Sequence, residues 1–173
     1  YPGEYEIRED IQNEIVPRVE EELNRPSNVD CTSNCLCHNV DRQRVAEIVN
    51  SFSDLSHPNW TDAVYVIECK RRTVSQKSVR EELKLQNRCR WIEQAQRCSR
   101  LLYVGVSKHV VNRLNQHAAA QGSGANFTQM FPAARVLSIE WYQARSVAYR
   151  AEKLTAAILD ETTDDRVYIA QPG

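Results

Sequence analysis

The spacing of apolar residues changes at Ala63, and this change constrains the fold of the chain more than any other feature. Before Ala63, apolar residues recur at helical spacing. After it come three short apolar runs, AVYVIEC at 63–69, LLYVGVS at 101–107 and ARVLSIEWY at 134–142. Their length and their β-branched and aromatic residues are typical of strands. We therefore expect a helical N-terminal extension over residues 1–60 and a strand-containing domain over 61–173.

The extension contains two amphipathic helices separated by a loop. In the first helix the apolar residues advance by four positions, at Ile7, Ile11, Ile15, Val19 and Leu23. Pro17 is expected to kink it, because proline removes a helical hydrogen bond. The second helix follows Asp41, a suitable N-cap, and carries an apolar stripe at Val45, Ile48, Val49 and Phe52. Residues 24–39 show no period and are expected to form a loop.

Helices are also predicted around the three strands. One covers residues 110–120 between the last two strands, and another covers 146–159. A helical insert from about Ser75 to Arg97 lies between the first two strands, and the S-x-x-E pattern at Ser78 and Glu81 resembles a capping box. The order of elements predicts an α+β fold, and the tail DDRVYIAQPG is expected to add a short edge strand.

Charge is distributed unevenly, although the chain as a whole carries only -1. Residues 1–62 hold 5 Lys/Arg against 13 Asp/Glu, a net of -8, whereas residues 70–113 hold 12 against 3, a net of +9. Such a basic region could bind a polyanion through phosphate neutralisation. Alternatively, it could pair with the acidic N-terminal part of the same chain.

The basic residues of the insert have helical spacing. Lys77, Arg80, Lys84 and Arg88 advance by three, four and four positions, which would place four cations on one helix face. Lys70, Arg71 and Arg72 precede them. This pattern predicts a face that contacts DNA phosphates, the alternative being a face that is merely solvated.

Three of the six cysteines cluster with a histidine in CTSNCLCH, at Cys31, Cys35, Cys37 and His38. Thiolates and an imidazole are ligands that zinc accepts, but the second, separated ligand pair of a usual structural site is missing. A zinc site, a disulfide and free thiols therefore all stay open. The first residues are too acidic for a secretory signal, and no apolar run is long enough to span a membrane. We expect a soluble, cytoplasmic protein that does not bind membranes.

Two predicted helices carry residues suited to chemistry. Arg113 and His117 are separated by four positions and so share one helix face. Glu152 shares an apolar-leaning face with Ala148, Thr155 and Leu159. A carboxylate turned toward a protein interior needs a counterion or hydrogen bonds. Glu152 is therefore expected to meet a metal ion or an arginine.

The order of AVYVIEC, LYVGVS, R-x-x-x-H, GANFT and the glutamate of YRAEKL resembles the GIY-YIG nuclease family over about residues 63–159. Ala63-Val64-Tyr65 stands where the family has Gly-Ile-Tyr, and Tyr103-Val104-Gly105 stands where it has Tyr-Ile-Gly. In the same comparison Arg113 matches the family arginine, Glu152 the metal-binding glutamate and His117 a histidine that many members carry. The Gly124–Thr128 turn resembles one that precedes the third strand in many members, with Asn126 in place of a basic residue.

Three departures accompany this resemblance. The two tyrosine motifs are much farther apart than in the family, so residues 70–100 form an insertion, which suggests a DNA-binding element particular to this chain. Ala63 replaces the first glycine of the pattern. No asparagine follows Glu152 where some members have one.

The resemblance implies a small three-stranded antiparallel sheet flanked by helices, and a metal-dependent DNA endonuclease. Mg²⁺ or Mn²⁺ would be held by Glu152 and phosphate oxygens, and Arg113 would brace the phosphate. The general base could be Tyr65, Tyr103 or His117. The residues expected to contact DNA are Lys70, Arg71, Arg72, Lys77, Arg80, Lys84, Arg88, Lys108 and Asn126.

Two other functions remain open on the sequence. The domain could bind DNA without cleaving it, or residues 1–60 could be a zinc-stabilised domain that recruits a protein partner. The N-terminal helices could also form a homodimer, which would allow both DNA strands to be cut.

Overall fold

The computed structural model describes residues 3–25, 34–36, 41–119 and 126–171, and its centre is a four-stranded sheet in the order β3-β1-β2-β4. The strands are β1 (Asp62–Cys69), β2 (Arg100–Ser107), β3 (Ala133–Tyr142) and β4 (Val167–Ala170). β1 runs antiparallel to both β2 and β3, and β4 runs parallel to β2. The α+β prediction and the short strand expected in the tail are confirmed. The sheet nevertheless has four strands rather than three, because that tail strand pairs with β2.

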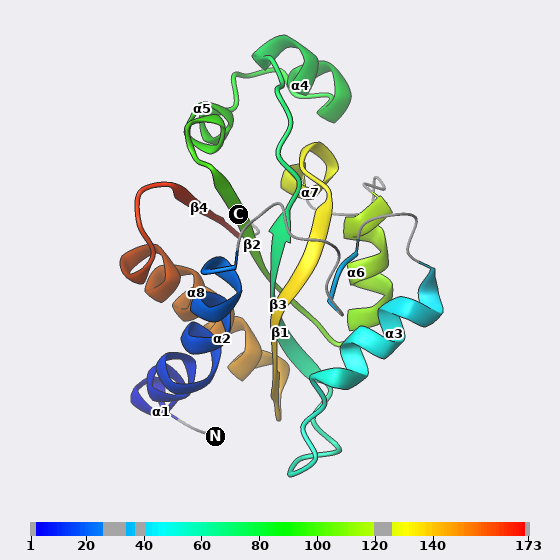
Figure 1. Ribbon diagram of the computed structural model, residues 1–173, viewed down its shortest axis with the longest axis vertical. Coiled ribbons are helices and arrows are strands. Elements are labelled where there is room, and N and C mark those ends of the chain that lie inside the picture. Colours follow the sequence, from blue (N-terminus) through cyan, green and yellow to red (C-terminus); the bar gives the residue numbers. More distant parts are fainter. Residues whose placement is uncertain (1–2, 26–33, 37–40, 120–125, 172–173) are drawn as a thin grey trace.

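Helices cover both faces of the sheet and make three layers (Figure 1). On one side lie α1 (Glu4–Asp10), the π-helix η1 (Ile11–Ile15), α2 (Val16–Leu23) and α8 (Arg145–Thr162). On the other side lie α3 (Arg42–Ser51), α6 (Val110–Ala119) and α7 (Asn126–Met130). Since side chains alternate along a strand, successive residues of β1 and β2 enter different cores.

The first three helical segments form one continuous run with a π-helix in its middle. Pro17 stands in the first turn of α2, directly after η1, where its missing N–H leaves a carbonyl of the preceding turn without its usual donor. Ile7, Ile11, Ile15 and Val19 are all buried. The wider π-helical turn keeps apolar residues spaced by four positions on one side, because an α-helix would rotate such a stripe around its axis.

These N-terminal helices are part of the core. Ile11 and Ile15 pack in the same cluster as Val64 and Val66 of β1 and Leu102 of β2. α3 contributes to the opposite cluster, and Asp41 caps it by accepting a hydrogen bond from the Arg44 N–H at 2.8 Å. Residues 1–60 thus supply part of both layers that flank the sheet. The domain boundary near residue 60 stays a prediction.

The insert between β1 and β2 contains two short helices, α4 (Gln76–Leu83) and α5 (Arg90–Arg97), at one end of the molecule (Figure 1). The helical insert is confirmed, but the continuous helix through 77–88 that the cation spacing implied is wrong, because Lys84 adopts a left-handed conformation with φ 56° and ends α4. The predicted capping box is also misplaced. Ser75 is the N-cap, and its hydroxyl accepts a hydrogen bond from the Ser78 N–H at 3.1 Å.

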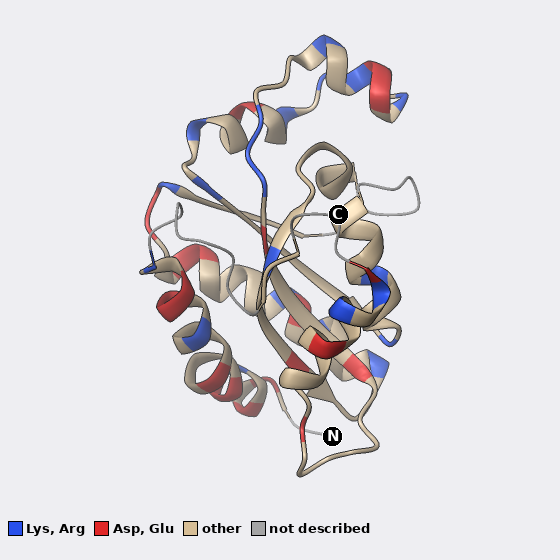
Figure 2. Cartoon of the chain, turned by 45° about the vertical axis from the view of Figure 1, so that its right-hand side comes forward, with Lys and Arg blue, Asp and Glu red and all other residues tan. Residues whose placement is uncertain are grey.

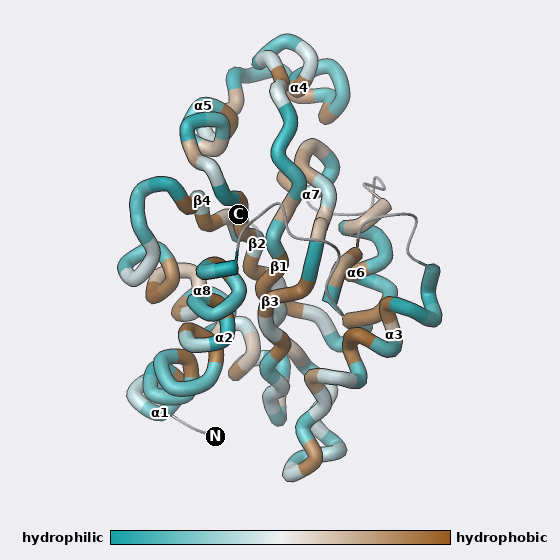
Figure 3. The backbone as a smooth tube through the Cα atoms, viewed as in Figure 1, coloured by the Kyte–Doolittle hydropathy of each residue, from teal (hydrophilic) through white to brown (hydrophobic). Residues whose placement is uncertain are grey.

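Charge follows this arrangement in space. Figure 2 shows Lys and Arg over the insert at the top, whereas Asp and Glu gather at the lower left, where α1 and α2 lie. Figure 3 shows hydrophobic residues concentrated along the strands and on the helix sides that face them. The basic and acidic parts of the sequence therefore lie mostly apart, and they meet chiefly at the base of the insert.

An ion network at that base ties four elements together. Glu68 of β1 accepts hydrogen bonds from Arg100 of β2 and from Arg135 of β3, the latter at 2.7 Å. Arg135 also pairs with Glu22 of α2 at 3.2 Å, and all four side chains are at most 15% exposed. The network anchors α2 to the end of the sheet where the insert departs.

No helix among the described residues has the length and apolar character needed to cross a membrane.

Candidate active site

Two tyrosines from neighbouring strands lie side by side on the α6 face of the sheet. Tyr65 of β1 and Tyr103 of β2 have ring centroids 6.4 Å apart, and both side chains are buried. Their residues alternate with Val64, Val66, Leu102 and Val104, which point into the opposite core. The strand period thus directs both phenols toward α6.

Gly105 provides the space that Tyr65 occupies. The two residues are register partners in the antiparallel β1–β2 pair. A Cβ atom added to Gly105 would lie 2.3 Å from the Tyr65 hydroxyl oxygen, well inside van der Waals contact. Glycine is therefore required here for the close approach of a side chain and not for an unusual backbone angle.

His117 of α6 links Tyr65 to α7. Its Nε2 atom lies 2.8 Å from the Tyr65 hydroxyl, and its Nδ1 atom lies 2.7 Å from the Thr128 hydroxyl. All three side chains are buried. The chain of contacts fixes the Tyr65 phenol from three elements, with donor and acceptor roles set by the imidazole tautomer.

Burial strongly disfavours charge on these groups. It raises the pKa of Tyr65 far above its ordinary value and that of Tyr103 to about 12, and in both cases it outweighs the lowering by Arg113. Arg113 alone therefore does not bring either phenol into the range of a general base at neutral pH. Burial, assisted by Arg113, lowers the pKa of His117 to about 3, so the imidazole is neutral at physiological pH.

Arg113 brings positive charge to both phenols. It lies one helical turn before His117 on α6 and is half-buried. Its charge acts on Tyr65, Tyr103 and His117, and its Nη1 atom donates to Gln116 at 3.3 Å. Arg113 thus adjoins the pair of tyrosines, as the sequence pattern predicts.

Glu152 approaches the same group from α8. Its side chain is buried, and its Oε2 atom has no hydrogen-bond partner within the described part of the chain. Burial raises the pKa of Glu152 to about 7, and the charge of Lys153 opposes that shift. Its charge in turn contributes to the raised pKa values of Tyr65 and Tyr103. Arg113 donates to Gln116 rather than to this Oε2 atom.

A buried carboxylate oxygen without a partner is suited to a hard divalent cation. Across residues 3–25, 34–36, 41–119 and 126–171, no group of three or more His, Cys, Asp or Glu side chains is arranged to hold a metal. Glu152 would therefore supply a single protein ligand. That is consistent with a cation that also takes water and phosphate oxygens, as Mg²⁺ commonly does.

The predicted DNA-contacting residues of the insert do not form one helix face. Lys77 and Arg80 lie on α4, Lys84 ends it, and Arg88 lies beyond it. Local acids neutralise part of the charge, since Arg88 pairs with Glu93 and Arg72 pairs with Glu82 at 3.5 Å. Lys70 and Arg71 are exposed on the segment that leads into α4. The insert therefore presents a basic surface rather than a single stripe.

The other two predicted contacts lie apart from each other. Lys108 comes directly after β2, at the end of the sheet where Ser107 pairs with Ala63. The insert emerges at the opposite end, where Cys69 pairs with Leu101. Asn126 begins α7 and is exposed. This segment touches the insert, because Phe127 of α7 and Phe131 directly after it contact Trp91 of α5, with ring centroids 5.5 and 6.3 Å from that of Trp91.

The cysteine cluster lies mainly outside the described residues. This applies to Cys31, Cys37 and His38. Cys35 is disulfide-bonded, so its sulfur is not the thiolate that a zinc site needs. Among the remaining cysteines, Cys69, Cys89 and Cys98 are free and buried.

Some residues of the site had no assigned role in the sequence. Thr128 belongs to the GANFT segment and holds His117, while Phe127 beside it stacks on Tyr103, with ring centroids 6.3 Å apart. Trp91 extends this aromatic contact into the insert. In the sequence, only the GANFT motif pointed to Thr128 and Phe127 as residues of the site. No sequence pattern pointed to Trp91.

Residues 90–157 match the family model described as the GIY-YIG catalytic domain. The match includes Tyr103, Arg113, His117 and Glu152, whereas Tyr65 lies before it. The resemblance to this nuclease family is thereby confirmed, and it indicates a nuclease-type function acting on nucleic acid. No curated protein and no solved structure matches the chain.

Proposed function

We propose that this chain, whose residues 90–157 carry the GIY-YIG catalytic domain, is a divalent-metal-dependent DNA endonuclease. The observation that carries the proposal is the Oε2 atom of buried Glu152, which has no hydrogen-bond partner among the described residues, while the charges of Glu152 and Arg113 both act on Tyr65 and Tyr103. A buried carboxylate of this kind costs free energy unless a cation binds it. A cation-dependent reaction at this position accounts for the arrangement.

Glu152 would hold the Mg²⁺ or Mn²⁺ ion, and water and the scissile phosphate would provide its other ligands. When bound, the ion would stabilise negative charge that develops on the leaving oxygen. The hydroxyl groups of Tyr65 and Tyr103 would orient the attacking water, since both phenols remain protonated. Arg113 would bind the phosphate and offset its charge.

Proton removal from the water would pass through Tyr65. Its hydroxyl is already hydrogen bonded to His117, at 2.8 Å from Nε2. The phenol can accept the proton of the water while it passes its own proton to that nitrogen, so no free phenolate forms. Because burial and Arg113 lower the pKa of His117 to about 3, this transfer requires the negative charge of the bound phosphate to raise that pKa. This requires the tautomer in which Nδ1–H donates to Thr128. Thr128 is then a positioning residue that sets which nitrogen accepts.

The insert would bind the DNA backbone. Lys70, Arg71 and Lys77 are exposed there, and none of them pairs with an acid in the described residues. Phosphate contacts of this type position a duplex without reading its sequence. Lys108 and Asn126 lie on other elements and would contact the substrate independently of the insert.

The decisive experiment is a cleavage assay with supercoiled, linear and branched DNA in Mg²⁺, in Mn²⁺ and in excess EDTA. We expect nicking that requires the cation and that Glu152→Gln abolishes. Glu161→Gln is the matched control, because Glu161 is an exposed carboxylate on the same helix.

The mapped cut sites would also distinguish structure-directed from sequence-directed cleavage. Cleavage that persists in EDTA or in Glu152→Gln would contradict the proposal. DNA binding without cleavage by the wild type in either metal would instead support a non-catalytic DNA-binding module.

A further inference from the structure

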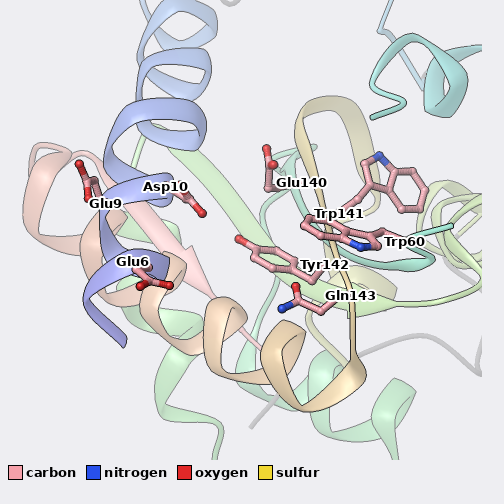
Figure 4. A pocket seen from close by; sticks show the side chains of 8 residues that line it. All are labelled: Glu6, Glu9, Asp10, Trp60, Glu140, Trp141, Tyr142 and Gln143. Atoms are coloured by element: carbon pink, nitrogen blue, oxygen red, sulfur yellow. The ribbon is translucent and has the colours of Figure 1, made fainter. Parts of the chain in front are cut away.

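A cleft of about 490 Å³ lies between α1 and the C-terminal end of β3 (Figure 4). Glu6, Glu9 and Asp10 of α1 line one side. Glu140 and Tyr142 of β3 lie opposite them, and Trp141 and Trp60 extend the wall. None of the proposed catalytic residues lines this cleft, so it is a separate site.

The cleft is strongly acidic, and Arg18 compensates only part of its charge. Glu140 pairs with Arg18 at 3.2 Å, but Glu6, Glu9 and Asp10 form no ion pair with any described residue. Burial first, and then the charges of Glu14, Glu9 and Glu6, raise the pKa of Asp10. Uncompensated carboxylates around a concavity concentrate cations there.

Tyr142 supplies a second observation that indicates a ligand. Its side chain is only 4% exposed, and its hydroxyl group has no hydrogen-bond partner among the described residues. Figure 4 shows this hydroxyl pointing toward α1, on the side of Asp10. A buried hydroxyl without a partner is costly, so a polar group that enters the cleft would gain by contacting it.

Aromatic side chains make the cleft suitable for a planar organic cation. The Trp141 indole N–H donates to the Phe52 carbonyl at 2.9 Å, which fixes the ring. Trp60 stacks on His57, with centroids 3.6 Å apart. A guanidinium group combines stacking on indoles with bidentate contacts to carboxylates. A bare metal ion is a poorer fit, since no described group of three or more acidic side chains is arranged as a metal site.

The neighbouring strand edge indicates that the cation belongs to a peptide. β3 is an edge strand, and its first half is covered by backbone hydrogen bonds with residues 34–36. No described backbone group pairs with the outer edge of residues 137–142, where only the Arg18 side chain reaches the Ile139 carbonyl at 3.4 Å. Such an edge can accept an added strand.

We propose that this cleft binds an extended, arginine-bearing segment of a partner protein. One arginine side chain would enter between the α1 carboxylates and Trp141 and would meet the Tyr142 hydroxyl. The peptide backbone would pair with the outer edge of β3 near Ile139. This proposal is independent of the nuclease function, because it uses other residues and needs no metal.

The test uses the full chain and an acetylated, amidated pentapeptide with arginine at its second and fourth positions. Binding is followed by the NMR shifts of the Trp60 and Trp141 indole N–H groups. We expect saturable shifts at both indoles and no shift at Trp91. The same peptide with citrulline in place of arginine should not bind, because citrulline keeps the shape but loses the charge.

Two double variants complete the test. Glu6→Gln with Asp10→Asn should weaken binding by roughly tenfold or more, since both remove charge-assisted contacts. Glu4→Gln with Glu21→Gln removes the same charge from exposed positions on the same helical run and should leave binding unchanged. All four positions are exposed, so both variants should keep the wild-type fold.

Equal weakening by the two variants would overturn the proposal, because it would indicate unspecific attraction. Absence of saturable binding would overturn it as well. Tighter binding of spermidine than of the peptide would show that the cleft takes a free polyamine and not a peptide.

Discussion

The contact between Gly105 and Tyr65 leads to a prediction at the scale of one residue. In Gly105→Ala the new methyl group would overlap the Tyr65 hydroxyl, so the phenol must move and lose its 2.8 Å contact with His117. We expect a loss of about 1–3 kcal/mol of unfolding free energy, as for overpacked cores, together with strongly reduced cleavage. Chemical denaturation and a nicking assay measure both effects.

Gly3→Ala is the control, because nothing lies within 4 Å of a Cβ atom at Gly3. Wild-type stability and activity in Gly105→Ala would contradict the tight fit of Tyr65.

The raised pKa of Glu152 predicts how stability and cleavage depend on pH. Its folded-state pKa of about 7 lies above the ordinary value of 4.5, so between these values the folded state keeps a proton that the unfolded state has lost. The unfolding free energy of the wild type should therefore fall as pH rises through this interval, whereas that of Glu152→Gln should fall less. Cleavage should change in the opposite direction and increase as the carboxylate forms.

Denaturation curves and cleavage rates recorded across the same pH range test this prediction. Above pH 7, added Mg²⁺ should raise the melting temperature of the wild type more than that of Glu152→Gln. Identical pH profiles for the two proteins would exclude Glu152 as the titrating group.

At the scale of elements, the aromatic contacts connect the insert to the site. Trp91 of α5 contacts Phe127 of α7, and Phe127 stacks on Tyr103. Trp91→Ala should lower the free energy of unfolding by about 2 kcal/mol. This is less than for a fully buried tryptophan, because Trp91 is only half-buried. Amide exchange should accelerate in residues 76–97, and DNA binding should weaken while the sheet stays protected.

Leu55→Ala provides the control, since Leu55 is 90% exposed. If exchange in the insert is unchanged by Trp91→Ala, then this contact does not hold α5 in place.

The elements also show how far local sequence patterns reach. The short apolar runs located β1, β2 and β3, and the apolar stripes located the helices on both faces. The break at Lys84 was not predicted, because a left-handed residue leaves no mark in the spacing of cations. The parallel pairing of β4 with β2 depends on contacts between distant residues, which no local pattern contains.

The same limit applies to the site. Helix spacing and a buried face identified Arg113 and Glu152, and the family resemblance identified the tyrosines. The alignment of Tyr65, His117 and Thr128 results from packing among β1, α6 and α7. The depressed pKa of His117 likewise follows from burial, which only the assembled structure reveals.

For the whole molecule, we expect the ion network around Glu68 to contribute strongly to the free energy of unfolding. Glu68→Gln removes the charge that Arg100 and Arg135 share, which leaves the nearly buried Arg100 without a counterion and Arg135 with Glu22 alone. We expect a loss of about 3–5 kcal/mol, as for other broken buried ion pairs. Thermal and denaturant unfolding measure it.

Glu4→Gln, which breaks the exposed pair with Arg8, should cost less than about 1 kcal/mol. Comparable losses of unfolding free energy in Glu4→Gln and Glu68→Gln would mean that burial of the Glu68 network contributes little to stability.

The insert leaves β1 at Cys69 and returns to β2 at Leu101, and these two residues are register partners. To the folding chain it is a long hairpin loop, and the entropy of closing such a loop increases only with the logarithm of its length, by about 0.6 kcal/mol for each doubling. Evolution can therefore lengthen, shorten or exchange this segment at little cost to the sheet. If the insert binds DNA as proposed, one scaffold could thus acquire different DNA targets over time by changing a single hairpin.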